Sequence, residues 1–595
     1  MLSALPSPTP RESRAIDLGL AHWVMARTGS RPLADAVRAA SCAEGEGHAC
    51  ARLATDGAED RDLPAIAGHP WVGRGEAFTP FVLDAGGRFY LWRNWQHETT
   101  LAAHIRRRCT ARIAVDPAPL AADLERLFAG MPAAPSASQR AAVACAPGKR
   151  FLVLTGGPGT GKTTTVVRML LMLLRHAAAA GLPAQPSIAL AAPTGKAAQR
   201  LAQAIAAGKA ALHTGLAGTA DGAPAPGPAE TAVAGTDWPT ALAAIPHASA
   251  TTLHRLLGYR PHLNDFAHGA QQPLAEDIVV VDEASMVDLA LMRQLLDALR
   301  PEALLILVGD PGQLASVEAG SVLADIVAAA GTHPLLAQHV AALDYSWRTG
   351  GALKDAIDAL RDTPDPTDDP LAATGGLALH HCASSRDLDT QLKRWIERHR
   401  ETLRRLLTTP LEAAEALELL RNMQILCALR EGPFGAAGIN TRQAQLLAEH
   451  FGVASTATWY PGRPVIITRN DDARGLANGD IGIALAGSGP LRVWFEHATR
   501  EGGTTWRSHS PRALPAHASA WAITVHRSQG SEYRDVAVVL PPDPEQPLAT
   551  RELVYTGVSR ARQHAELWTT EPALRAALHR PVTRLGGLRE KLGGT

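Results

Sequence analysis

One stretch of the sequence, residues 151–167, restricts the fold of this chain more than any other. It reads FLVLTGGPGTGKTTTVV and matches the phosphate-loop pattern G-x-x-x-x-G-K-[ST] at Gly156, Gly161, Lys162 and Thr163. A short apolar run precedes the loop, and a helical pattern rich in Leu and Met follows it. This strand–loop–helix context predicts a nucleotide-binding α/β domain. A Gly-rich turn that matches by chance does not account for the strand, the Lys-Thr pair and the helix together.

The residue types of this loop fit a triphosphate. Glycines let successive backbone N–H groups point at phosphate oxygens, and the N-terminus of the following helix adds its positive dipole. Lys162 can reach the β and γ phosphates, and the Thr163 hydroxyl can ligate Mg²⁺. Because nucleotide binding alone names no function, the rest of the chain has to supply it.

Two further apolar runs end in polar residues. Residues 278–281 read as a buried parallel strand that ends in Asp282 and Glu283, which suit a Mg²⁺ ligand and the general base for attack on the γ phosphate. Residues 304–308 form a similar strand before Asp310 and Gln313, which suit sensing of the γ phosphate. The plain alternatives are a solvated acidic loop and an ordinary Asp-Pro-Gly turn. Together these strands predict a nucleotide-binding core.

Other polar residues are candidates for contacts with a base or with nucleic acid. Gln139, just before a predicted helix, can read the edge of adenine through its amide. Thr194 and Lys196 follow a predicted strand at 188–192 and suit a nucleic-acid phosphate, because ligands bind at the carboxyl edge of open α/β sheets. A surface glutamine and a helix cap are the alternatives for Gln139 and Thr194.

The C-terminal half adds further candidates. Arg348 suits neutralisation of transition-state charge from the far side of the nucleotide, although a lone arginine is more often a surface charge. Arg560 suits the γ phosphate. The residues suited to the nucleotide and Mg²⁺ neighbourhood are Gln529, Gly530 and Glu532, and those suited to the DNA backbone are Thr524 and His526. Singly, each can equally be a structural polar group.

Length and composition limit the remaining possibilities. A chain of 595 residues is too long for one core, and roughly three to five domains are expected. The formal net charge is zero, so a nucleic-acid surface has to be a local groove. The six cysteines form no C-x-x-C pair, and we find no signal-peptide pattern and no apolar run long enough for a bilayer. We therefore expect a cytoplasmic protein without a membrane partner.

Three regions are predicted along the chain. Residues 1–125 read as an N-terminal, mostly helical domain without a catalytic constellation, for which a partner-docking role is predicted. Residues 126–345 hold the phosphate loop, and residues 346–595 hold a second α/β unit. Short strands between turns at about 458–515 predict a small β-barrel-like insert. Residues 207–248 are of low complexity and are predicted to be a flexible surface loop.

Seven stretches, taken in order, resemble the motifs of superfamily 1 helicases. They are GGPGTGKT, APTGKAAQRL, TLHRLLG, VVDEASMVD, LVGDPGQLASVEAGSVL, AITVHRSQGSEY and YTGVSRAR, within about residues 139–562. Among these helicases the chain is most similar to the RecD family, the alpha subunits of exodeoxyribonuclease V. GHACARL and PFVLDAGGRFYLWRNWQHETTLAAHI resemble the N-terminal domain of that family. Gly557-Val558-Ser559 departs conservatively from the Ala-Ile-Thr of many relatives.

The resemblance implies a fold, an activity and partners. The fold is α/β, with two RecA-like phosphate-loop NTPase domains, a small β-barrel (SH3-like) insert, and ATP in the cleft between the two domains. The activity is that of an ATP-dependent 5′→3′ DNA helicase subunit of a RecBCD-type helicase–nuclease, which acts in double-strand break repair and recombination. The implied partners are single-stranded DNA, DNA ends, and RecB-like and RecC-like subunits in a heterotrimer. The implied cofactors are ATP and Mg²⁺.

The same resemblance assigns roles to residues. The residues implied in catalysis are Lys162, Glu283, Arg348 and Arg560, the two arginines as arginine fingers. The implied Mg²⁺ ligands are Thr163 and Asp282. The residues implied to contact the nucleotide are Gln139, Gly156, Gly157, Pro158, Gly159, Thr160, Gly161, Lys162, Thr163, Thr164, Gln313, Gly530 and Glu532. The candidate DNA contacts are Thr194, His254, Thr524 and His526.

Three other functions fit parts of the sequence: a stand-alone RecD-like helicase, a nucleotide-switched scaffold ATPase, and an RNA helicase of the same superfamily. The long stand-alone forms carry helix–hairpin–helix repeats in an extended N-terminal region, and we find no such repeats. Glu283 and the two arginines favour turnover, although a slow switch can keep them. No RNA-binding module is evident.

Overall fold

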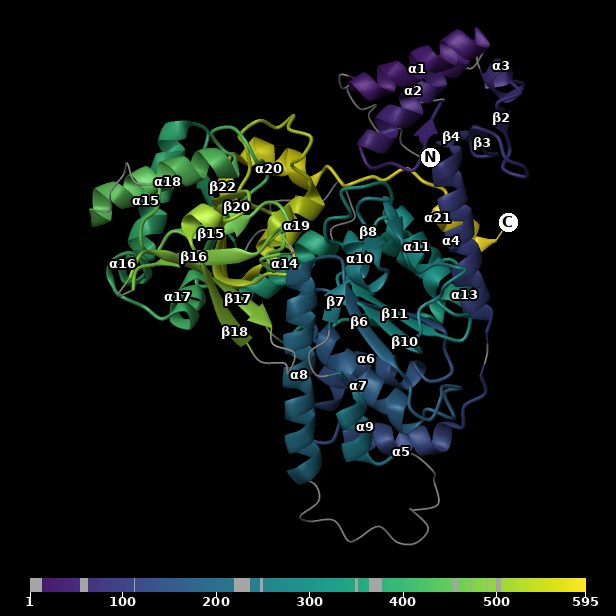
Figure 1. Ribbon diagram of the computed structural model, residues 1–595, viewed down its shortest axis with the longest axis horizontal. Coiled ribbons are helices and arrows are strands. Elements are labelled where there is room, and N and C mark those ends of the chain that lie inside the picture. Colours follow the sequence, from purple (N-terminus) through teal and green to yellow (C-terminus); the bar gives the residue numbers. More distant parts are fainter. Residues whose placement is uncertain are drawn as a thin grey trace.

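The computed structural model contains two α/β units, each built on a parallel β-sheet, an antiparallel sheet inserted in the second unit, and a small N-terminal subdomain (Figure 1). It describes residues 13–53, 63–111, 113–218, 236–246, 250–347, 351–362, 377–452, 458–471, 473–487, 489–498 and 504–594. No helix among these residues combines the length and the apolar character needed to cross a membrane.

The first α/β unit contains a six-stranded parallel sheet in the order β12-β5-β11-β10-β6-β7. Its strands are β5 (Phe151–Gly156), β6 (Ile188–Ala192), β7 (Ala250–Thr252), β10 (Ile278–Val281), β11 (Leu304–Gly309) and β12 (Val340–Leu343). Leu305 and Leu307 of β11 face one helix layer, and Ile306 between them faces the other. A sheet covered on both faces requires such continuous apolar runs, and the strands predicted at 278–281 and 304–308 are confirmed.

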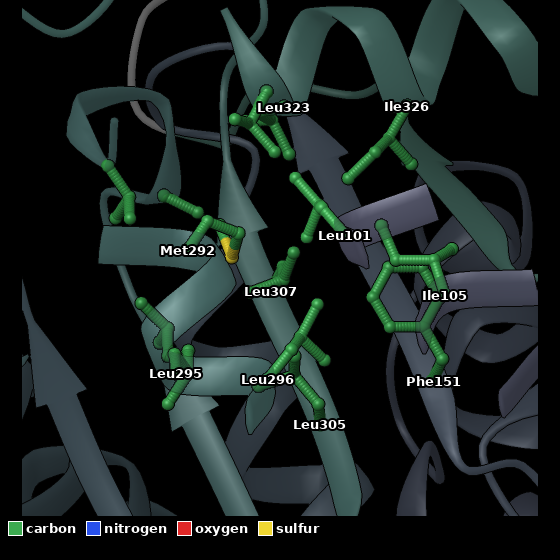
Figure 2. Close-up of a cluster of buried hydrophobic side chains, with 14 of the residues drawn as sticks. Leu101, Ile105, Phe151, Met292, Leu295, Leu296, Leu305, Leu307, Leu323 and Ile326 are labelled. Carbon is green, nitrogen blue, oxygen red and sulfur yellow. The ribbon is translucent and has the colours of Figure 1, made fainter. Parts of the chain in front are cut away.

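Helices cover both faces of this sheet. One layer contains α5 (Pro117–Leu127), α6 (Ala133–Cys145), α7 (Lys162–Arg175), α8 (Gly195–Gly218) and α9 (Trp238–Ala244). The opposite layer contains α10 (Leu253–Leu256), α11 (Leu289–Ala298), α12 (Val322–Ala330) and α13 (Pro334–Ala337). Figure 2 shows the core beneath this second layer, where Met292 and Leu296 of α11 and Leu323 of α12 surround β11.

Helix α4 (Trp92–Thr110) also belongs to this second core, although it lies within the predicted N-terminal domain. Its Leu101 and Ile105 pack near Phe151 of β5 (Figure 2). The buried guanidinium of Arg108 donates hydrogen bonds to three carbonyl oxygens at the end of α11 and in the turn that follows. The acceptors are Leu299, Arg300 and Ala303, at 3.1, 2.9 and 2.7 Å. A domain boundary at residue 125 therefore cuts through a packed core.

The stretch predicted as a flexible loop at 207–248 is helical at both of its described ends, so the prediction is wrong there. Helix α8 continues to Gly218, and α9 begins at Trp238. Residues 219–235 lie outside the described residues. The reason is that alanine has the highest intrinsic helix propensity, which the low complexity of the stretch concealed. The buried Lys209 of α8 donates a hydrogen bond to the Ile245 carbonyl after α9 and ties the two helices together.

The second α/β unit contains a five-stranded parallel sheet in the order β13-β22-β21-β14-β20. Its strands are β13 (Ala378–His381), β14 (Met423–Cys427), β20 (Ala522–Thr524), β21 (Tyr533–Val539) and β22 (Ala561–Thr569). Its helices are α14 (Ala352–Asp362), α15 (Ser385–Arg398), α16 (Arg400–Thr408), α17 (Ala413–Leu420), α18 (Ala436–Phe451), α19 (Arg551–Val558) and α20 (Glu571–Leu578). Ile425 and Leu426 of β14 enter the hydrophobic cores on opposite faces.

The insert sheet lies between α18 and β20 in the chain and is antiparallel throughout. Its strands are β15 (Pro464–Ile467), β16 (Ile481–Leu485), β17 (Arg492–Ala498), β18 (Thr504–His509) and β19 (His517–Ser519), in the order β18-β17-β16-β15-β19. Strand β18 lies inside the predicted range of the insert, 458–515, whereas β19 lies just beyond it. Among the described residues β18 and β19 are the two ends of the ladder, so closure into a barrel stays a prediction.

The N-terminal subdomain combines helices with a four-stranded sheet. Its elements are α1 (Ala15–Thr28), α2 (Arg31–Gly45), α3 (Leu63–Ala67), β1 (Ala51–Arg52), β2 (Val72–Gly73), β3 (Phe81–Leu83) and β4 (Arg88–Leu91). Several large apolar side chains remain exposed on it, among them Ile16, Trp23 and Phe78. A small subdomain gains stability by burying such groups, and apolar side chains left exposed often mark a surface that binds another molecule.

The last residues of the chain, 580–594, form what we call the C-terminal strap, which leaves α20 of the second unit and crosses to the other side of the molecule (Figure 1). It ends in α21 (Leu588–Gly593), which packs against α4 and α12. The Ala49 backbone N–H donates to the Leu585 carbonyl at 2.8 Å, and the Gly587 N–H donates to the buried carboxylate of Glu98 at 2.9 Å. The strap thus holds the N-terminal subdomain against the first unit.

Candidate active site

The phosphate loop joins β5 to α7 at the carboxyl edge of the first sheet. Gly159 and Gly161 have φ angles of 77° and 80°, which residues with a side chain rarely adopt. The Lys162 ammonium donates hydrogen bonds to the carbonyls of Gly156 at 2.7 Å and Gly157 at 3.0 Å. The lysine is therefore folded over the loop that it is predicted to serve.

Gln139 supports this loop from below. It lies inside α6 and is only 2% exposed, so the prediction that it precedes a helix is wrong; the helix begins six residues earlier, at Ala133. Its side-chain N–H donates to the Thr160 carbonyl at 3.0 Å. A Cβ at Gly161 would lie 2.5 Å from the Gln139 amide nitrogen, which explains glycine there in addition to its φ angle. The Gln139 side-chain oxygen is buried without a hydrogen bond among the described residues.

The paired carboxylates follow β10, two strands from β5. Burial and the neighbouring Glu283 carboxylate raise the pKa of Asp282 to about 6, whereas Lys162 and Arg200 act in the opposite direction. Glu283 has a φ of 52°, a left-handed conformation that is strained for a residue with a side chain. Such strain persists only where the surrounding structure fixes it, and here it turns Glu283 away from the strand direction.

A cleft of about 250 Å³ brings these groups together with residues of the second unit. From the first unit it is lined by Pro158, Gly159, Thr160, Gly161, Lys162, Thr163, Thr164, Ala197, Arg200, Ala204, Asp282, Glu283 and Gln313. From the second unit it is lined by Gly530, Glu532, Ser559 and Arg560. The structure therefore gathers most of the residues predicted for the nucleotide around one cavity between the two units.

Several hydrogen bonds cross from one unit to the other beside this cleft, and two of them share residues of one network. The side-chain oxygen of Gln313, after β11, accepts a hydrogen bond from the Arg560 guanidinium at 2.8 Å. The Tyr555 hydroxyl of α19 donates to the buried Asp310 carboxylate at 2.8 Å. Asp310 also accepts from the Gln313 amide at 3.1 Å, so the two pairs form one network. Burial and Asp310 raise the pKa of Tyr555, which therefore stays a proton donor.

Arg560 is 4% exposed and is held on several sides. Its guanidinium donates to the Thr556 carbonyl at 3.1 Å and to the Ser531 carbonyl at 3.5 Å, as well as to Gln313. A buried cation is costly unless its donors are satisfied. A buried arginine that lines a cleft can recover this free-energy cost by binding an anion there. The position of Arg560 therefore fits contact with a phosphate.

Several residues at this site are absent from the predicted set, and three of them contact the phosphate loop or the network at Asp310. Trp347 donates its backbone N–H to the Gly159 carbonyl at 2.8 Å, and its side chain stays 40% exposed beside Gly161. Arg361 of α14 approaches Gly157, with Nη1 3.1 Å from the place of a Cβ on that glycine. Tyr555 is the third. Trp347 directly precedes the predicted arginine finger Arg348, and this position is the sequence signal that could have identified it. Tyr555 and Arg361 lie in helical patterns and have no such signal.

Arg348, the other predicted arginine finger, lies outside the described residues. The described chain stops at Trp347 and resumes at Gly351. The role of Arg348 therefore stays a prediction.

The four candidate DNA contacts lie elsewhere, at the carboxyl ends of strands that do not carry the phosphate loop. Thr194 follows β6 and accepts a hydrogen bond from the Ala197 N–H at 3.2 Å, as a helix cap does. His254 of α10 follows β7, and its ring lies 5.3 Å from that of Tyr259. Thr524 ends β20, and His526 comes two residues later. Burial and the nearby Arg584 of the strap lower the pKa of His526.

Thr163 and Asp282 line the same cleft, so a hydroxyl and a carboxylate are available to Mg²⁺ there. These two donors fit the ion only together with phosphate oxygens, as in other phosphate-loop proteins. Among the described residues no group of three or more His, Cys, Asp or Glu side chains is arranged to hold a metal.

Comparison with known proteins agrees with this arrangement. Residues 139–319, which hold the phosphate loop, match the AAA domain family, and residues 519–567 match the UvrD-like helicase C-terminal domain. The two matches flank the cleft, and they define the class of protein as a superfamily 1 helicase.

Curated relatives narrow the class to a family. The RecBCD enzyme subunit RecD of Mycolicibacterium smegmatis is 37% identical over 90% of this chain and 86% of its own length. The subunit of the same name from Haemophilus influenzae is 32% identical over 85% of this chain and 80% of its own. The chain therefore belongs to the RecD family. Among solved structures, the Pif1 helicase from Candida albicans is similar, with a TM-score of 0.35 at 14% identity, over 72% of this chain and 93% of that one.

Proposed function

We propose that this chain is the ATP-dependent DNA helicase subunit of a RecBCD-type helicase–nuclease, which acts on DNA ends in double-strand break repair and recombination. It hydrolyses ATP in the cleft between its two α/β units and moves 5′→3′ along single-stranded DNA. The observation that carries the proposal is the cleft itself, which brings Lys162 and Glu283 of the first unit opposite Arg560 of the second.

The residues divide the work of hydrolysis. When ATP binds, the Lys162 ammonium leaves the carbonyls of its own loop and contacts the β and γ phosphates. The backbone N–H groups of the loop donate hydrogen bonds to the same phosphates. Thr163 and Asp282 would hold Mg²⁺, which supplies neutralisation of the phosphate charge. Glu283 orients the attacking water and accepts its proton. Arg560 stabilises the charge that develops on the γ phosphate from the opposite side.

Hydrolysis is coupled to movement through the network that crosses the cleft. Gln313 and Asp310 stand at the end of β11 in the first unit, while Arg560 and Tyr555 belong to the second. A change at the γ phosphate alters these bonds and hence the distance between the units, which is a mode of domain closure. Each cycle moves the units along one strand, gripped through its phosphates near Thr194, His254, Thr524 and His526, and the grip is therefore sensitive to salt.

Trp347 is proposed as a platform for the base of the nucleotide. Its exposed ring stands beside Gly161, above the buried Gln139, which was predicted to read adenine. An aromatic face stacks on any base, so the platform contributes affinity, and specificity has to come from an edge contact.

The decisive experiment measures ATP hydrolysis with and without single-stranded DNA, and unwinding of duplexes with 5′ or 3′ overhangs. We expect stimulation by the strand and unwinding only from the 5′ overhang. Equal hydrolysis with and without the strand contradicts the motor and favours a nucleotide-switched scaffold ATPase. Equal stimulation by RNA favours an RNA helicase, and a 3′ preference reverses the proposed direction.

RecB-like and RecC-like subunits are the proposed partners, and a cytoplasmic location is part of the proposal. Exposed Trp23 and Phe78 support the N-terminal region, within residues 1–125, as the docking surface. Trp23→Glu is expected to reduce co-purification with the partners at least about tenfold, as loss of an aromatic anchor does at an interface. Leu263→Glu changes another exposed apolar residue, which lies on the first unit, and is the control. If Trp23→Glu co-purifies with the partners as well as the parent chain does, the docking surface lies elsewhere. If the parent chain itself assembles with neither subunit, a stand-alone helicase is favoured.

A further inference from the structure

Arg200 of α8 has no part in the proposed mechanism, yet it lines the nucleotide cleft. Ala197, Arg200 and Ala204 fall on one face of the helix, at spacings of three and four residues, and all three border the cleft. Because its two neighbours on this face are alanines, Arg200 is the long side chain that α8 brings to the border of the nucleotide cleft.

Arg200 spans the gap between the units. One guanidinium nitrogen donates to the Gly530 carbonyl at 2.6 Å, and another lies 3.2 Å from the Glu532 carboxylate. Gly530 has a φ of 69°, so the chain turns sharply here and presents its carbonyl to the arginine. A first-unit side chain thus holds residues 530–532 of the second unit, which we call the 530–532 loop.

The same loop supports Arg560 from its other side. The middle residue, Ser531, accepts a hydrogen bond from the Arg560 guanidinium through its carbonyl. Its neighbours in the loop are the two residues bound by Arg200. A shift of this short segment therefore moves a partner of Arg560, and through Arg560 the bond to Gln313.

The two arginines differ in how tightly they are held. Arg560 is almost fully buried, whereas the Arg200 side chain is 36% exposed. Arg200 can therefore respond to a charge arriving in the cleft at a lower cost than Arg560.

We propose that Arg200 is a positioning residue for ATP hydrolysis, which clamps the 530–532 loop onto α8 and thereby places Arg560 at the γ phosphate. It acts through Arg560 and does not itself have to touch the phosphate. This inference rests on the proposed function, since it presumes strand-stimulated hydrolysis in the cleft.

The test compares Arg200→Ala with Arg562→Ala. Arg562 also approaches Glu532, at 3.2 Å, but it belongs to the second unit and does not border the nucleotide cleft, so it is a matched control. Arg200→Ala is expected to lower kcat for strand-stimulated hydrolysis about 10- to 100-fold, as a misplaced catalytic group does, with KM changed much less. Arg562→Ala is expected to stay within about twofold of the parent chain, and Arg200→Lys to recover part of the loss.

A double variant separates positioning from independent action. If Arg200 works through Arg560, Arg200→Ala adds little to the loss already caused by Arg560→Ala. If the loss of kcat in the double variant equals the product of the two single losses, the inference is overturned. A normal kcat for Arg200→Ala, or an equal loss in Arg562→Ala, would overturn it as well. If the parent chain showed no strand-stimulated hydrolysis, that result would instead contradict the proposed function. Thermal melting of each variant, expected within a few degrees of the parent because Arg200 is partly exposed, excludes general unfolding as the cause.

Discussion

The first and second α/β units have similar parallel sheets, but they meet the cleft with opposite edges. The first unit brings the phosphate loop and the paired carboxylates, which follow the carboxyl ends of β5 and β10. The second unit brings Glu532 and Arg560, which come directly before β21 and β22 at the amino edge of its sheet. The phosphate-loop pattern occurs once in the sequence. The comparison teaches that a shared fold does not fix which edge of a sheet meets the ligand, while the residues that each unit brings to the cleft decide which unit binds and which responds.

If the first unit binds the nucleotide and the second unit responds to it, a change in the phosphate loop is expected to lower ATP turnover most. Lys162→Ala is expected to lower strand-stimulated ATP turnover at least about 1,000-fold, because the cation that meets the β and γ phosphates is lost from a water-poor cleft. Hydrolysis by purified protein measures it. Lys393→Ala, an exposed lysine of the second unit, is the control and is expected to keep normal turnover. Comparable losses in both variants would break the asymmetry between the units.

Glu283→Gln is expected to come next, with hydrolysis reduced about 100- to 1,000-fold while ATP still binds, because glutamine keeps the shape but cannot accept a proton. Single-turnover hydrolysis and nucleotide binding, measured side by side, distinguish the two steps. Glu276→Gln, before the amino end of the same strand, is the matched control. Wild-type hydrolysis in Glu283→Gln would remove this residue from the role of base.

A smaller effect is expected on the responding side. Tyr555→Phe removes the hydrogen bond to Asp310 that joins the units, and we expect turnover to fall about tenfold, the size expected for a bond to a charged group. Tyr460→Phe removes another buried hydroxyl of the second unit, whose partner is Trp521, and controls for lost stability. If thermal melting falls equally in both but turnover falls only in Tyr555→Phe, the bond serves communication between the units.

The smallest effect is expected from pH. Asp282 has a pKa raised to about 6, so below that pH it is increasingly protonated and binds Mg²⁺ less well. The Mg²⁺ concentration for half-maximal hydrolysis is expected to rise as pH falls from 7.5 to 5.5, by at most about tenfold per pH unit, and to stay flat above about pH 7. Asp282→Asn, which cannot titrate, is expected to lose this slope. A slope unchanged in Asp282→Asn would assign the titration to another group.

Local patterns were enough to predict that Lys162, Thr163 and Asp282 come after apolar strands at one edge of the first sheet, and the structure brings all three to the cleft. Their roles in binding stay predictions. The pairing of Gln313 with Arg560 joins positions 247 residues apart, and no local pattern contains that information. Motif resemblance supplied both residues, but not the fact that they touch.

The misses have physical reasons as well. Tyr555 lies in a short buried helix, where an aromatic residue reads as core. Arg200 stands in a motif, but only the folded chain shows that α8 faces the 530–532 loop. Helix α4 has a basic outer face, and the apolar face that binds it to the first unit could be assigned to any neighbour. Tertiary partners of this kind are decided by the whole chain.

The C-terminal strap has a consequence for how the protein is made. Leu588 and Leu592 belong to the same hydrophobic core as Phe151 and Leu101, so residues near the end of the chain complete a core begun by the first third. During synthesis this core stays unfinished until α21 has left the ribosome, and its apolar surface is exposed for that time. A nascent chain halted before residue 588 is therefore expected to aggregate more readily than one that includes this helix.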